Sequence, residues 1–90
     1  MPKVKFTSAL KPFFPDLADT KVEGNSVKEV LTALDDQFPG LNSYLLNDSG
    51  ALRKHVNIYI KDALVNDRTT LSDAVSREDE ILIYQALSGG

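Results

Sequence analysis

Residues 26–40 read SVKEVLTALDDQFPG and carry the strongest structural signal in the chain. Ser26 and Glu29 match a capping box, in which each side chain accepts a hydrogen bond from the other residue's backbone N–H. Apolar residues follow at the spacing of one helix face, at Val27, Val30, Leu31, Leu34 and Phe38. Pro39-Gly40 ends the pattern. The stretch predicts one amphipathic α-helix whose water-facing side carries Lys28, Thr32, Asp35 and Asp36.

Two short strand patterns precede this helix. Residues 3–8 alternate between polar and apolar, and residues 19–23 give a weaker pattern that we expect to pair antiparallel with the first. The segment between them contains Pro12 and Pro15 and reads as a loop or wide turn. Its Phe13 and Phe14 rings are expected to lie beneath the sheet edge.

The chain beyond the helix predicts more strands. Residues 41–46 suggest a further helical turn, residues 47–50 a loop, and residues 56–60 a strand with Val56, Ile58 and Ile60 inward. Lys61-Asp62 reads as a turn, residues 63–65 as a short returning strand, residues 70–75 as one helical turn, and residues 81–86 as the last strand.

This order of elements is typical of the α+β class and of the β-grasp (ubiquitin-like) fold. We therefore expect a mixed sheet of four to five strands with one main helix packed on one face. The crossover after the second strand lets the first and last strands pair in parallel at the sheet centre. Residues 1–86 would form the domain, and residues 87–90 a flexible C-terminal tail.

Composition excludes several classes of function. The chain has 90 residues, a net charge of −3 and no cysteine, which argues against a disulfide framework, a cysteine metal site and a nucleic-acid-binding surface. No apolar run has the length of a membrane span, and the N-terminus has no signal-peptide pattern, so we expect a cytoplasmic protein that acts without a membrane.

The side chains offer little catalytic chemistry. His55 has no partner at a useful spacing and is expected to be a surface or strand-end residue. The adjacent carboxylates at Asp35-Asp36 and at residues 78–80 are expected to be solvated rather than catalytic. No glycine-rich phosphate loop is present, so the chain is predicted to hold no ATP, metal or other cofactor of its own.

The end of the chain reads Gln85-Ala86-Leu87-Ser88-Gly89-Gly90. Two glycines without Cβ atoms can enter a narrow channel, where the terminal carboxylate is the reactive group. Transfer to AMP from ATP would activate this carboxylate toward a sulfur or nitrogen nucleophile. Because the chain itself shows no ATP site, another protein would carry out the activation.

A patch of apolar and aromatic residues is predicted beside this tail. If Ile81 and Ile83 point into the core, Leu82 and Tyr84 must point out, since strand faces alternate. Asn57 and Tyr59 point out from the strand expected next to it. With Leu87, these residues would form a partner-binding surface.

The whole chain resembles the MoaD/ThiS family of small sulfur-carrier proteins, relatives of ubiquitin. The resemblance rests on Gly89-Gly90 after the strand 81–84, on the capped helix at Ser26 and on the run HVNIYIKD at residues 55–62. That run and the tail are similar to carriers that deliver sulfide for cysteine synthesis.

The resemblance implies a carrier rather than an enzyme, a monomer on its own or the small subunit of a synthase complex. An E1-like ThiF/MoeB-type adenylyltransferase would adenylate Gly90 with ATP, and a sulfur donor would convert it to a thiocarboxylate. A downstream synthase for cysteine, molybdopterin, thiamin or a similar product would accept the sulfur. Gly89, Ser88 and Leu87 would fit the tail to these partners.

Two alternatives remain open at this point. The chain could be a ubiquitin-like protein modifier that is conjugated to lysine side chains through Gly90. It could also be a β-grasp interaction module whose tail is chemically inert.

Overall fold

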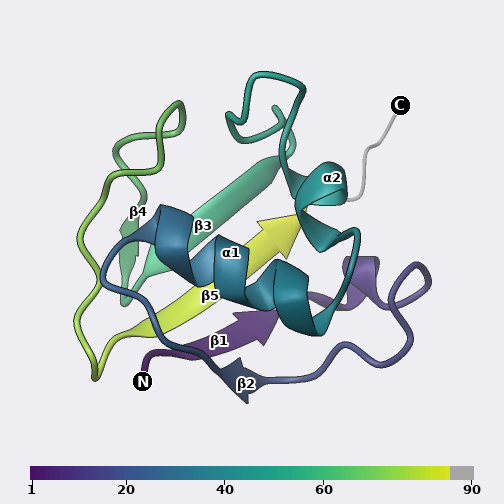
Figure 1. Cartoon of the computed structure of the whole chain (residues 1–90), viewed down its shortest axis with the longest axis horizontal. Helices are drawn as coiled ribbons and strands as arrows, with labels where there is room; N and C mark the ends of the chain where they lie inside the picture. Colours follow the sequence, from purple (N-terminus) through teal and green to yellow (C-terminus); the bar gives the residue numbers. More distant parts are fainter. Residues whose placement is uncertain (86–90) are drawn as a thin grey trace.

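The computed structural model describes residues 1–85, in which five strands form one mixed sheet in the order β2-β1-β5-β3-β4 (Figure 1). The elements are β1 (Lys3–Phe6), η1 (Ser8–Leu10), β2 (Thr20–Lys21), α1 (Val27–Gln37), α2 (Leu41–Leu45), β3 (Val56–Ile60), β4 (Ala63–Leu64) and β5 (Glu80–Gln85). β1 pairs antiparallel with β2 and parallel with β5, as predicted. The arrangement is the β-grasp fold. The predicted end of the last strand at residue 86 and the tail 87–90 lie outside the described residues.

The helix α1 begins where the sequence predicts. The Ser26 hydroxyl accepts a hydrogen bond from the Glu29 backbone N–H at 3.2 Å. The Glu29 carboxylate, however, accepts from the N–H of Asn25 at 3.0 Å, one residue earlier than a capping box requires. Ser26 therefore caps the first turn of α1, and Glu29 binds the backbone of the residue before the cap.

The sequence predicts Asp35 on the water-facing side of the helix, but the structure differs. Asp35 is half-buried, and its carboxylate accepts a hydrogen bond from the backbone N–H of Asn42 at 3.0 Å. Because the first N–H groups of a helix have no partner within that helix, this bond satisfies one of them in α2. Asp35 therefore fixes α2 against the end of α1.

One face of the sheet is covered by α1 and carries the core (Figure 1). The core side chains come from the sheet, both helices and the connecting segments, and the largest fully buried ones include Leu10, Leu31, Leu34, Leu41, Leu45, Ile58, Ile81 and Ile83. Of the predicted inward residues, Val27, Val30, Leu31 and Leu34 are buried in α1. Phe38 is the C-cap residue of this helix and is half-buried against the core.

Two expectations for the first loop and its strands are corrected. β1 ends at Phe6, and β2 contains only Thr20 and Lys21. Phe14 is half-buried against the core, but Phe13 is 57% exposed rather than covered by the sheet edge. The exposed ring stacks on Tyr44 of α2 instead.

Residues 70–75 form no helical turn, so this prediction is wrong. The Asp67 carboxylate accepts hydrogen bonds from the backbone N–H groups of Thr69, Thr70 and Ser72 at 3.0, 2.9 and 3.1 Å. It also accepts from the Thr70 and Ser72 hydroxyls. These side-chain bonds compete with helical backbone bonds. The bonds from Ser72 and Thr70 hold the pKa of the Asp67 carboxyl well below its usual range.

We expect Leu31→Ala to lower the free energy of unfolding by about 2–5 kcal/mol, because it opens a cavity under α1. Urea denaturation measures the change. Leu64→Ala is the matched control, since Leu64 is 51% exposed and its truncation should change stability by no more than about 0.5 kcal/mol. Equal effects of the two substitutions would contradict this placement of the core.

We expect Asp67→Asn to lower the free energy of unfolding at neutral pH. We also expect this free energy to decrease less steeply in the variant as the pH is lowered. Because the pKa of Asp67 is lower in the folded than in the unfolded chain, its charged form stabilises the fold above about pH 4. This contribution disappears as the pH drops further. Unfolding measured from neutral pH to about pH 2 tests the slope. Asp36→Asn controls for the change in net charge, and identical curves for both variants would refute the role of Asp67.

Candidate functional site

The central strand β5 leads to the end of the chain. Residues 80–83 pair in parallel with residues 3–6 of β1, and residues 81–85 pair antiparallel with β3. At its end, Gln85 lies opposite Val56, and the Gln85 backbone N–H donates to the Thr7 hydroxyl at 3.2 Å. The sheet therefore holds the last described residue from both sides, five residues before Gly90.

The start of β5 is held by Asp79, which we had expected to be solvated. Its side chain is instead 7% exposed, accepts from the Ser76 backbone N–H at 2.8 Å and pairs with the Lys61 ammonium at 3.4 Å. Its backbone carbonyl accepts from the Lys3 N–H at 3.1 Å. Asp79 thus has a structural role. Glu80 pairs with Lys5 at 3.1 Å in an exposed contact, which contributes little to stability.

The predicted partner-binding residues of the two strands lie together. Tyr59 is directly opposite Leu82, and Asn57 is directly opposite Tyr84. We call these four residues the outer-face patch, because they occupy the sheet face opposite the buried Ile58, Ile81 and Ile83 of the α1 side. Tyr84 is 40% exposed, and the other three are half-buried. The predicted tail residues Leu87, Ser88, Gly89 and Gly90 lie outside the described part of the chain.

Asn57 differs from the other members of the outer-face patch because its side chain is already bonded. Its amide oxygen accepts from the Arg68 guanidinium at 2.6 Å. The same guanidinium donates to the backbone carbonyl of Arg53 at 2.7 Å. Asn57 therefore ties β3 to the following loop, and the apolar part of the patch is formed by Leu82, Tyr84 and Tyr59.

A second group of aromatic rings lies near Gln85, where β5 ends, and sequence reasoning missed it. Tyr44 of α2 packs against Phe13 at a ring-centroid distance of 4.7 Å and against Phe14 at 5.8 Å. The available signal in the sequence was a pair of adjacent phenylalanines between two prolines, in a segment without strand alternation. Their partner Tyr44 could not be found this way, because the contact depends on how α2 packs.

A shallow hollow of about 230 Å³ joins Tyr44 to the end of β5, and its lining consists of Ser43, Tyr44, Arg53, His55 and Gln85. His55 is exposed, as predicted. The side-chain oxygen of Gln85 is shielded from solvent and has no hydrogen-bond donor among residues 1–85.

Within residues 1–85, no three His, Cys, Asp or Glu side chains are grouped to hold a metal ion. No helix in this part of the chain is both long and apolar enough to cross a membrane.

Comparisons with known proteins agree with this geometry. The ThiS family model matches residues 4–90. The chain is 27% identical over 89 residues to the sulfur carrier protein CysO of Mycobacterium tuberculosis, with 97% of this chain and 96% of that protein covered. A chain of the Amycolatopsis orientalis BexX/CysO complex gives a TM-score of 0.85 at 20% identity, with 100% of both chains covered. The small archaeal modifier protein 1 (SAMP1) of Methanosarcina acetivorans gives a TM-score of 0.77 at 26% identity, covering 99% of this chain and 95% of that one.

Proposed function

The chain belongs to the ThiS family, and from that premise we propose that it is a sulfur carrier whose Gly90 carboxylate receives one sulfur atom and hands it on. The observation that carries the proposal is that the family match extends to residue 90 and so includes the Gly-Gly end. The relative named as a sulfur carrier matches 97% of the chain. Since the chain has no cysteine, a side-chain thiol cannot be the carrier group.

The proposed chemistry exchanges one oxygen atom for one sulfur atom. On an E1-like ThiF/MoeB-type adenylyltransferase, the Gly90 carboxylate attacks the α-phosphorus of ATP, and pyrophosphate leaves. Hydrosulfide from a sulfur donor then attacks the carbonyl carbon of the acyl adenylate, and AMP leaves. The resulting thiocarboxylate attacks an electrophile on the acceptor enzyme, and hydrolysis returns the Gly90 carboxylate. The chain is thus a substrate of its activating enzyme and not a catalyst.

The body of the protein supports this use in two ways. β5 is held by a neighbour on each side, so the position of Gln85, the last described residue, is fixed by the sheet. The outer-face patch lies on the last strand itself and offers Leu82, Tyr84 and Tyr59 as apolar contacts. We propose that this patch docks both the activating enzyme and the acceptor synthase.

The acceptor that we propose is a synthase that uses the sulfide for cysteine. The similarity of residues 55–62 and of the tail to such carriers supports it, as does the match to CysO. Synthases for molybdopterin or thiamin are the other members of this acceptor class. We propose that these reactions take place in the cytoplasm.

A second candidate function is protein modification through Gly90. The likeness to the small archaeal modifier protein 1 favours it, because that chain shares the fold at 26% identity. The same acyl adenylate would then be attacked by a lysine amine instead of hydrosulfide, with AMP leaving in both cases. The two functions are distinguished by the product formed.

We expect deletion of Gly90 to abolish sulfur loading without changing stability, because all buried core side chains among residues 1–85 precede Tyr84. Incubation with the adenylyltransferase, ATP and sulfide, followed by intact-mass measurement, should show one oxygen-to-sulfur exchange in the wild-type chain only. A chain extended by one alanine after Gly90 is the matched control and should also remain unloaded.

Sulfur loading of the deleted or extended chain would refute Gly90 as the carrier group. Lysine-linked conjugates without a thiocarboxylate would instead favour the modifier function.

A further inference from the structure

We propose that Phe13, Phe14 and Tyr44, which we call the aromatic surface, form a second docking surface together with the cations Arg53 and Lys54. The occupant is the adenylating enzyme that takes the end of the chain, and it would present an apolar side chain bordered by carboxylates. This proposal rests on the proposed function, because it requires an enzyme that acts on Gly90.

The position of the aromatic surface follows from the length of chain beyond β5. Five residues follow Gln85 in the sequence, and five residues span at most about 17 Å. An enzyme that surrounds Gly90 must therefore lie against the molecule close to Gln85. Tyr44 lines the same hollow as Gln85, and the Phe13 ring lies 4.7 Å from the Tyr44 ring. The aromatic surface is thus within reach of such an enzyme.

Phe13 has the features of an anchor for a partner. Its ring is 57% exposed, and it borders a hollow of about 200 Å³ that is also lined by Phe14, Pro15, Phe38 and Pro39. Pro12 and Pro15 restrict the backbone on both sides of the two phenylalanines. Less conformational freedom is therefore lost when a partner covers the ring. Clustered exposed aromatic rings of this kind are typical of binding surfaces.

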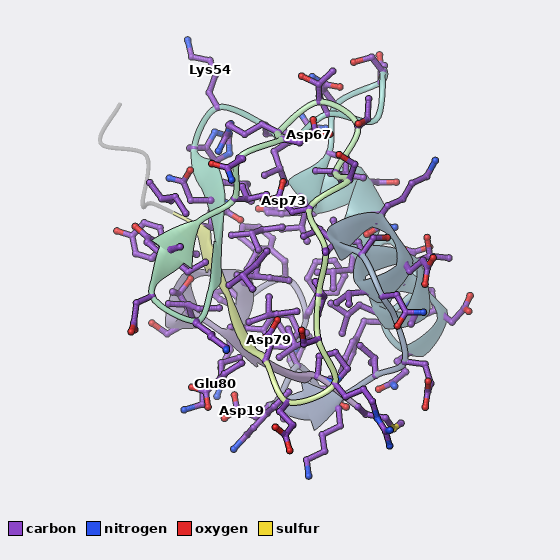
Figure 2. The ribbon with its side chains drawn as sticks, turned by 90° about the vertical axis from the view of Figure 1, so that its left-hand side faces the viewer. Asp19, Lys54, Asp67, Asp73, Asp79 and Glu80 are labelled. Carbon is purple, nitrogen blue, oxygen red and sulfur yellow. The ribbon has the colours of Figure 1, made fainter. Side chains whose placement is uncertain are left out.

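The charge at this end of β5 indicates the chemistry of the partner. Although the net charge of the chain is −3, residues 53–55 are Arg, Lys and His. Arg53 and Lys54 are both exposed, and Arg53 also donates to the Ser43 carbonyl at 3.0 Å. Neither ion pair found within residues 1–85 involves Lys54. Figure 2 shows Lys54 projecting away from the body, at the opposite end from Asp79 and Glu80. Carboxylates on the partner would complement this segment.

The hollow beside Gln85 supports the same assignment. Tyr44 and His55 line this hollow together with Gln85, so the hollow connects the end of β5 to the aromatic surface.

The test is pyrophosphate exchange with the E1-like adenylyltransferase of the same organism and the full chain as substrate. We expect Phe13→Ala to raise the KM for the carrier about tenfold with kcat unchanged, the loss that one anchor residue causes. Phe13→Leu should recover part of the loss. Lys54→Glu should also raise KM and weaken its dependence on salt.

Matched controls exist in β2 and α1. Lys21→Glu reverses an exposed charge in the edge strand β2, and Lys28→Glu reverses an exposed charge in the first turn of α1. Both should keep the wild-type KM. If Phe13→Ala fails to fold by circular dichroism, Lys54→Glu decides, because neither ion pair found within residues 1–85 involves Lys54.

The outcomes separate this proposal from the proposed function. If Gly90 deletion abolishes exchange while Phe13→Ala and Lys54→Glu behave like the controls, the carrier function stands and the docking surface is wrong. If the wild-type chain supports no exchange, both the carrier function and the docking surface are wrong. A dimer that depends on Phe13, seen by light scattering with an unchanged KM, would assign the aromatic surface to self-association and overturn the proposal.

Discussion

The parallel pairing of β1 with β5 is the interaction on which the rest of the molecule depends. It joins the two ends of the chain, residues 3–6 with residues 80–83, and it places the last strand inside the sheet instead of at its edge. Chain termini usually fray because few bonds hold them. Here β3 binds the other side of β5, so the backbone is supported up to Gln85. The last described residue is therefore held in place by both neighbouring strands.

The position of β5 along its own axis is fixed at both ends. Asp79 holds the start through the Ser76 N–H and Lys61, and the Thr7 hydroxyl holds the end through the Gln85 N–H. A slip by one residue would bury Leu82 and Tyr84 and expose the apolar core face, so the register is strongly specified. The same constraint sets which side chains surround the strand end and which face the outer side of the sheet.

Local patterns explain which parts of the fold could be predicted. α1 and β3 have clear periodicity and well-defined breakers, so their positions and inward faces were predictable, and so was the pairing of the outer-face patch. The segment after β4 was not, because the Asp67 carboxylate accepts hydrogen bonds from the backbone N–H and the hydroxyl of Ser72 in place of helical bonds. That Asp67, Thr70 and Ser72 cluster within six residues was the missed signal. Phe13 and Tyr44 meet through tertiary packing, which no spacing in the sequence records.

The chemistry of a Gly-Gly end cannot by itself select a partner, because any chain with this end offers the same carboxylate. Discrimination between partners must then come from the folded body, as a difference in binding free energy between right and wrong enzymes. The outer-face patch lies on the open sheet face along β5 and β3, and the aromatic surface lies beside α2 near the end of β5. An enzyme that contacts both surfaces fixes the orientation of the carrier as well as its identity. With two separate surfaces, an activating enzyme and an acceptor can both contact the outer-face patch and differ in whether they contact the aromatic surface. The same short tail can then be passed between distinct active sites.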